Sequence, residues 1–174
     1  MRRARDSSGQ EGPIISGKTA APPRILVFGV GNPGRCDDGL GAQAVERLAG
    51  AGLPGVTYNA NYQLNVEDAL ACSRNDIVIF IDAARGLRRP FALRRIAGDG
   101  RAPAMTHALG PQAVLAICAE LYGRAPDSYV LAIRGREWGL GEGLSPEAAK
   151  NLAAAVDYLK EFLTKKKPAR KRVR

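Results

Sequence analysis

One stretch of the chain, Ile25 to Leu48, restricts the fold more than any other part. It begins with a short apolar run, Ile25 to Val30, which is typical of a strand that is covered on both faces. It ends with Gly41 to Leu48, where apolar residues recur at helical spacing. Glycines crowd the junction, and they permit a sharp turn and a close approach of the backbone. The stretch therefore predicts a strand, a tight turn that contains Asp37 and Asp38, and a helix.

Strand-like and helix-like segments alternate along the rest of the chain. We expect further strands at Val56–Tyr58, Asp76–Ile81, Phe91–Ile96 and Tyr129–Ile133. We expect further helices at Val66–Cys72, Gly110–Tyr122 and Ser145 to about Leu163, the last with Ser145 as its N-cap. The segment Phe91–Ile96 contains Arg94 and Arg95, which favour the edge of a sheet. This order predicts a three-layer α/β/α sandwich, phosphorylase/hydrolase-like, with a twisted and mostly parallel sheet of about five strands.

The positive charge of the chain lies at its ends. The formal net charge is +9, yet residues 24–164 carry 15 Lys and Arg against 15 Asp and Glu. The last ten residues carry seven Lys and Arg and no acid. We therefore expect a disordered leader at residues 1–23, one domain at 24–164, and a basic disordered tail at 165–174 that makes at most weak contacts with nucleic acid.

Apolar runs and cysteines indicate the compartment. No run approaches the roughly 18 apolar residues of a spanning helix, and the N-terminus lacks the apolar region of a signal peptide. The three cysteines are widely spaced, which fits reduced thiols rather than disulfides or a zinc site. We expect a cytoplasmic monomer with no membrane partner.

The glycine pattern also satisfies a dinucleotide-binding motif, because Gly29, Gly31 and Gly34 follow a strand as GxGxxG. Two features argue against that function. The residues Arg35 to Gly39 separate the third glycine from the helix and bring two acids where a pyrophosphate needs positive potential. The second strand does not end in an acid that could bind a ribose.

Three side chains form a candidate metal site. Asp38 lies in the loop after the first strand, Asp82 follows a buried strand, and His107, the only histidine, precedes a helix. Loops at the carboxyl ends of parallel strands converge, and two oxygens with one nitrogen suit a catalytic divalent metal. Each residue also has a structural alternative, as a helix cap for Asp37 or Asp38, as a turn acceptor for Asp82, or as a structural histidine. Cys36 is a weaker candidate nucleophile, since no Cys–His pair is predicted near it.

The motifs resemble those of a known family. The segments VFGVGNPGRCDDGLG, IFIDA and THALGP, in this order and spacing, and later GLGEGLSPEA, are similar to those of the hydrogenase maturation proteases, from Arg24 to about Leu163. The resemblance implies a mainly parallel sheet between helices. It also implies that nickel is bound by the residues that match the family's ligands, which are Asp38, Asp82 and His107.

The resemblance implies an aspartyl-type, metal-dependent endopeptidase. Members of this family remove the C-terminal extension from the nickel-loaded precursor of a nickel-iron hydrogenase large subunit. The nickel then comes from the substrate and serves as the recognition element, although other divalent ions could bind in vitro. Asp38 and its partners would contact the nickel while a polarised water attacks the scissile carbonyl. Asp37 would orient the loop or assist proton transfer.

Two other functions stay open at this point. The chain could be a non-catalytic chaperone or sensor of the hydrogenase metal centre. It also resembles peptidyl-tRNA hydrolases in VFGVGNPG, but those enzymes need a histidine soon after this motif, and none precedes His107. One segment, NANYQL, departs from the glycine-rich, Asp-containing segment of some maturation proteases, which leaves the class of hydrogenase substrate open.

Overall fold

The computed structural model describes residues 22–98 and 109–166. These residues form five strands, which are β1 (Ile25–Val30), β2 (Val56–Asn61), β3 (Ile77–Ala84), β4 (Phe91–Ile96) and β5 (Asp127–Arg134). They also form a short 3-10 helix, η1 (Cys36–Gly39), and the helices α1 (Leu40–Gly50), α2 (Asp68–Ser73), α3 (Pro111–Tyr122) and α4 (Pro146–Lys166). The strand–turn–helix expected at the start of the domain is confirmed.

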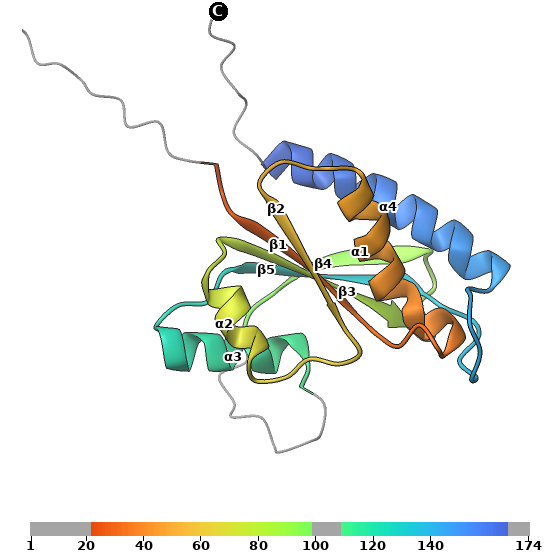
Figure 1. The fold of residues 1–174 in the computed structure, drawn as a ribbon, viewed down its shortest axis with the longest axis horizontal. Coiled ribbons are helices and arrows are strands. Elements are labelled where there is room, and N and C mark those ends of the chain that lie inside the picture. Colours follow the sequence, from red (N-terminus) through yellow and green to blue (C-terminus); the bar gives the residue numbers. More distant parts are fainter. Residues whose placement is uncertain (1–21, 99–108, 167–174) are drawn as a thin grey trace, which may run out of the picture.

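The strands form one sheet in the order β2-β1-β3-β5-β4 (Figure 1). Strand β1 pairs in parallel with β2 and β3, and β3 pairs in parallel with β5. Strand β4 lies at one edge and is antiparallel to β5, with Arg94 and Arg95 exposed. The predicted mostly parallel sheet of five strands and the predicted edge strand are both confirmed.

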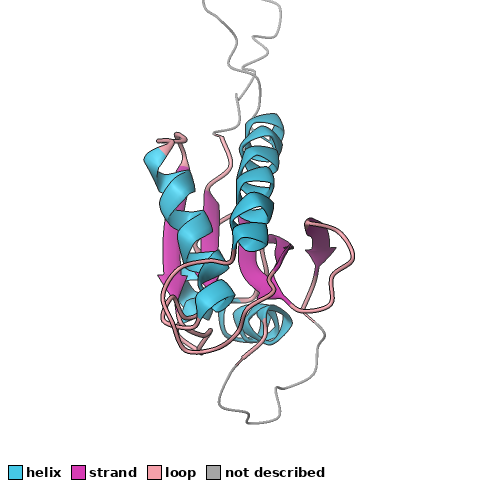
Figure 2. Cartoon of the chain, turned by 90° about the vertical axis from the view of Figure 1, so that its right-hand side faces the viewer, coloured by secondary structure: helices cyan, strands magenta, loops and turns pink. Residues whose placement is uncertain are grey.

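Helices cover both faces of the sheet and make the three expected layers. Figure 1 shows α1 and α4 on one side of the strands and α2 and α3 on the other. Turned by 90°, Figure 2 shows α1 and α4 lying along the strands. The first core joins Val27 and Ile79 to α1 and α4, and the second joins Phe28 and Phe80 to α2 and α3. Neighbouring residues of one strand thus belong to different cores, because side chains of a strand alternate between its faces.

Two element boundaries differ from the sequence prediction near the expected site. Strand β3 does not stop before Asp82 but continues to Ala84, because β5 supplies pairing partners as far as Arg134. Helix α2 begins at Asp68 rather than at Val66, and Val66 is exposed. The Asp68 carboxylate accepts a hydrogen bond from the Asn65 amide at 2.8 Å, which holds the preceding residues in a turn.

The last helix also corrects a predicted boundary. Helix α4 runs through Lys165 and Lys166, two residues into the segment predicted as a disordered tail. The Lys166 ammonium donates to the Tyr129 hydroxyl at 2.7 Å, and a cation near a helix C-terminus is favourable. The predictions for residues 1–21 and 167–174 lie outside the described residues. None of the helices in the described ranges has both the length and the apolar character that crossing a bilayer requires.

Candidate active site

The loop after β1 folds back over its own start and fixes Asp38. Gly31 has a φ of +127°, and a Cβ there would overlap the carbonyl oxygen of Asp38, so only glycine fits. The amide of Asn32 donates to the Asp38 carboxylate at 2.9 Å, and the Asn32 side chain accepts from Gly34 at 2.9 Å. Asp38 is half-buried, so its carboxylate is fixed without being sealed from solvent.

A glycine contact brings this loop onto the centre of the sheet. Gly41, in the first turn of α1, has no room for a Cβ, which would overlap the carbonyl oxygens of Val30 and Ile81. Gly29 faces the Gly41 carbonyl with the same lack of space. The start of α1 therefore crosses directly over the ends of β1 and β3, and β3 is the strand that carries Asp82. Of the glycines in the GxGxxG pattern, Gly29 is thus explained by close packing of helix on sheet, and Gly31 by the turn that leads to Asp38.

Asp82 lies near Asp38 and interacts with it electrostatically. Burial raises the pKa of the Asp82 carboxyl to about 6, although a 2.7 Å hydrogen bond from the Ala83 amide opposes this and the Asp38 charge adds to it. Two carboxylates in one low-dielectric place repel each other, which a divalent cation would relieve. The structure therefore brings together two of the three residues predicted as metal ligands.

The third predicted ligand, His107, lies outside the described residues. Leu109, which follows shortly after it, pairs with Leu64 in an isolated antiparallel bridge. In the described ranges, 22–98 and 109–166, no group of three or more His, Cys, Asp or Glu side chains could hold a metal ion. The complete trio of ligands stays a prediction.

The segment NANYQL, which begins within β2, borders this loop. The Asn61 carbonyl accepts a hydrogen bond from the Gly31 amide at 3.1 Å. The Asn61 side chain in turn donates to the buried Asp68 at 3.3 Å. Burial raises the pKa of Asp68, against hydrogen bonds from Asn65 and Asn61 that lower it. Asn61, in the segment NANYQL, therefore contacts the loop that carries Asp38.

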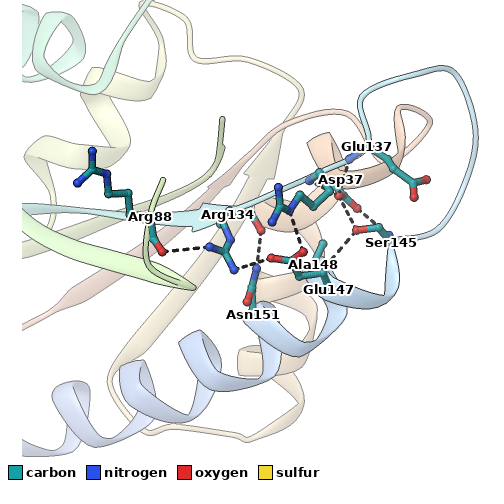
Figure 3. Close-up of polar contacts among 9 residues, drawn as sticks. Asp37, Arg88, Arg134, Glu137, Ser145, Glu147, Ala148 and Asn151 are labelled. Carbon is teal, nitrogen blue, oxygen red and sulfur yellow. Dashed lines mark hydrogen bonds and ion pairs between the residues drawn. The ribbon is translucent and has the colours of Figure 1, made fainter. Parts of the chain in front are cut away.

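Asp37 lies beside Asp38 in sequence but has a different environment. Its side chain is fully buried, and its carboxylate accepts hydrogen bonds from the amides of Arg136 (2.6 Å), Glu137 (2.9 Å) and Ser145 (2.7 Å) and from the Ser145 hydroxyl (2.8 Å) (Figure 3). Burial by itself raises the pKa of this carboxyl, but the four hydrogen bonds outweigh it and the pKa is lowered. We call this arrangement of Asp37 with these three residues the Asp37 clamp.

The clamp is extended by a short strand-like contact between the two loops. The Cys36 amide donates to the Gly141 carbonyl at 2.8 Å, and the Gly141 amide donates to the Gly34 carbonyl at 3.0 Å. Cys36 has a φ of +52°, which is uncommon for a residue other than glycine. The loop between β5 and α4 is therefore fastened along the loop that carries Asp38.

Helix α4 is tied to the same loop by charged groups. The Glu147 carboxylate binds both Arg134 and Arg136, and the Asn151 side chain donates to the Arg134 carbonyl at 2.9 Å (Figure 3). Ser145 also caps the helix, because its hydroxyl accepts the Ala148 amide at 3.2 Å. The sequence predicted Ser145 as a cap but not as a partner of Asp37. The only signal for that contact was the density of glycines in GREWGLGEGLS.

Comparison with known proteins identifies the architecture. No family model matches the sequence, and no curated protein matches it significantly. Among solved structures, a hydrogenase 2 maturation peptidase from a Thaumarchaeota archaeon is 25% identical, with a TM-score of 0.60 over 80% of this chain and 97% of its own. This chain has the fold of the hydrogenase maturation proteases.

Other maturation proteases agree with this result. The protease HycI from Thermococcus kodakarensis is 22% identical, with a TM-score of 0.63 over 83% of this chain and 95% of its own. The endopeptidase HybD from Escherichia coli is 24% identical, with a TM-score of 0.63 over 82% of this chain and 93% of its own. The family resemblance seen in the sequence motifs is thereby confirmed, and the sheet whose strand β3 carries Asp82 is that of a maturation-protease fold.

Proposed function

We propose that the chain is an endopeptidase that removes the C-terminal extension of the nickel-loaded precursor of a nickel-iron hydrogenase large subunit. The observation that carries this proposal is the meeting of Asp38 and Asp82, two half-buried carboxylates, on a maturation-protease fold. The three similar structures support the same activity, since each is a hydrogenase maturation protease, peptidase or endopeptidase. We place the protein in the cytoplasm, as a monomer that binds the precursor.

The nickel in this proposal is part of the substrate. Asp38 and Asp82 offer oxygen ligands, and their mutual repulsion favours the arrival of a divalent cation. His107 is the proposed nitrogen ligand. Contact between these residues and the nickel would then distinguish a loaded precursor from an unloaded one, so that cleavage follows metal insertion.

The reaction is hydrolysis of one peptide bond. A water oxygen adds to the scissile carbonyl carbon, the C–N bond breaks, and the nitrogen of the released extension takes a proton. Asp38 is half-buried, and among residues 22–98 and 109–166 only one of its oxygens accepts a hydrogen bond, so this carboxylate is available to act at the reacting atoms.

We assign Asp37 a positioning role rather than a role in proton transfer. Its carboxylate already accepts four hydrogen bonds, and its lowered pKa disfavours uptake of a proton. Of the two functions predicted for Asp37, orientation of the loop therefore has the stronger support.

The decisive experiment compares nickel-loaded and nickel-free precursor. Incubation with the protein should shorten only the loaded precursor, as measured by the mass of its C-terminal peptide. The variants Asp38→Asn and His107→Ala should abolish the shortening while the folded domain is retained. Asp157→Asn is a matched control, because Asp157 is an exposed aspartate on α4, and it should leave processing intact.

The outcomes separate the two functions that remain. A loaded precursor that binds the protein stably and keeps its mass would support the metal-centre chaperone or sensor. Equal cleavage of loaded and nickel-free precursor would refute recognition of nickel. Full activity of His107→Ala would remove this histidine from the proposed ligands.

A further inference from the structure

An arginine and a tryptophan form a stacked pair near the candidate active site. Arg85 follows Asp82 by three residues, at the end of β3. Its guanidinium carbon lies 4.3 Å from the centre of the Trp138 ring, within the range of a cation–π contact. Trp138 belongs to the loop between β5 and α4. The pair therefore joins two loops at the carboxyl ends of β3 and β5, where Asp82 lies.

The tryptophan is held in place from behind. A Cβ on Gly135 would lie 2.9 Å from Cζ2 of Trp138 and 2.9 Å from the Cβ of Asp37, so the ring packs against the Gly135 backbone. The two residues before Trp138, Arg136 and Glu137, donate hydrogen bonds from their amides to the Asp37 carboxylate. The indole is therefore a fixed platform, and the arginine that stacks on it is restricted in the same way.

The donors of Arg85 are not used by the described part of the chain. Arg134 and Arg136 both bind Glu147, whereas Arg85 is exposed and pairs with no carboxylate among residues 22–98 and 109–166. Stacking uses the face of a guanidinium and leaves the N–H groups along its edge available for two parallel hydrogen bonds. The next residues, through Pro90, add Arg88 and Arg89 and no acid.

We propose that Arg85, stacked on Trp138, binds a carboxylate of the polypeptide that enters the site. Asp38 and Asp82 repel an acidic segment, and a fixed guanidinium near them offsets this repulsion and sets where the segment lies. The carboxylate comes from an Asp or Glu side chain of the polypeptide or from its C-terminus. That the polypeptide is a hydrogenase precursor rests on the proposed function, whereas the binding of a carboxylate does not.

The test uses Trp138 as its own reporter, because it is the only tryptophan in the chain. Three N-acetylated probes are titrated against the full chain: penta-alanine with a free C-terminus, penta-alanine amide, and the amide with its central alanine replaced by Glu. A carboxylate on Arg85 changes the charge over the indole and hence its fluorescence. We expect saturable changes with the free acid, with the Glu peptide or with both, which identifies the source, and none with penta-alanine amide.

Variants distinguish binding of the peptide by Arg85 from a general effect of the protein's positive charge. Arg85→Gln should weaken binding of the responsive peptide at least about tenfold, and Arg85→Lys should weaken it less, because lysine keeps the charge but not the planar fork. Arg74→Gln is the matched control, an exposed arginine directly after α2, and should bind like the wild type. Added salt, at about 0.5 M, should weaken binding to an exposed arginine.

Two results would overturn the proposal. One is an equal response to the acidic peptides and to penta-alanine amide, and the other is unchanged affinity in Arg85→Gln. If carboxylate binding depends on Arg85 but the protein never cleaves loaded precursor, the proposed function is refuted and the role of Arg85 stands. In an active protein, replacing the acids of the precursor's extension should raise KM more than it lowers kcat. In the variant Arg85→Gln the same replacements should raise KM less than they do in the wild type.

Discussion

Replacing Asp37 by asparagine should destabilise the domain by about 4 kcal/mol. The Oδ2 atom accepts three of the four hydrogen bonds and Oδ1 accepts the fourth, from the Ser145 amide. Asparagine keeps one oxygen, so its amide nitrogen faces at least one buried donor, and the remaining bonds lose their ionic character. Hydrogen bonds to a charged group contribute roughly 1.5–3 kcal/mol, against about 1 for neutral ones, and an unpaired buried donor costs roughly 1–3 kcal/mol. The loss is large against a total stability of about 5–15 kcal/mol.

Urea unfolding followed by two signals measures this effect. Far-UV circular dichroism reports the whole fold, whereas Trp138 fluorescence reports the loop that Asp37 holds. If the loop detaches first, the fluorescence of Asp37→Asn changes at lower urea than the dichroism, while the two signals coincide in the wild type. Asp157→Asn, on the exposed face of α4, is the control and should stay within about 0.5 kcal/mol of the wild type.

The effect should depend on pH in a defined direction. The pKa of Asp37 is lowered in the folded state, so its stabilising contribution is present above the ordinary value of 3.8 and is lost as the pH falls through the folded value. The difference between wild type and Asp37→Asn should therefore shrink below about pH 4. A variant that unfolds within about 0.5 kcal/mol of the wild type at neutral pH would refute the clamp. If that variant had also lost processing, a role in proton transfer would be supported instead.

Three further perturbations test other parts of the structure. Asp82→Asn should stabilise the metal-free protein by at most about 3 kcal/mol near pH 7.5. Folding raises the pKa of Asp82 to about 6, so the wild type loses stability as the pH rises through about 4 to 6. Urea unfolding should show this difference near pH 7.5 and little difference near pH 3.5. Gly41→Ala should lower the thermal midpoint by the equivalent of about 3 kcal/mol, since its Cβ meets two strand carbonyls, whereas Gly50→Ala in the same helix meets nothing and should raise it slightly. Truncation after Lys166 should preserve both stability and cleavage, but truncation after Thr164 should cost about 1 kcal/mol in urea unfolding by removing the contacts of Lys166 with β5.

Local sequence patterns were sufficient for the layers of the fold. Buried strands such as β3 begin with an apolar run, and the arginines of β4 mark an edge, so the order and placement of these elements could be predicted. The ends of elements could not. Strand β3 passes Asp82 because β5 is long enough to pair with it, and that length is a property of another segment of the chain.

The candidate site was predictable where its residues follow the strands. Asp38 and Asp82 could be placed together because the carboxyl ends of parallel strands lie at one edge. The role of Asp37 could not be found this way, because its partners lie about 100 residues away, three of its four donors are backbone amides, and the fourth is the hydroxyl of a predicted helix cap. Two adjacent aspartates look alike in sequence, and only their surroundings in the fold distinguish the half-buried Asp38 from the buried, fully hydrogen-bonded Asp37.

In the Asp37 clamp, the carboxylate of Asp37 binds the main-chain amides of Arg136 and Glu137 rather than their side chains. A carboxylate that grips amide N–H groups accepts almost any residue at those positions except proline, which has no N–H. The side chains of this loop can therefore change without loss of its attachment to the loop that carries Asp38. Substrate preference could diverge among descendants of this protein by substitutions on that loop alone, while the geometry around Asp38 is inherited intact.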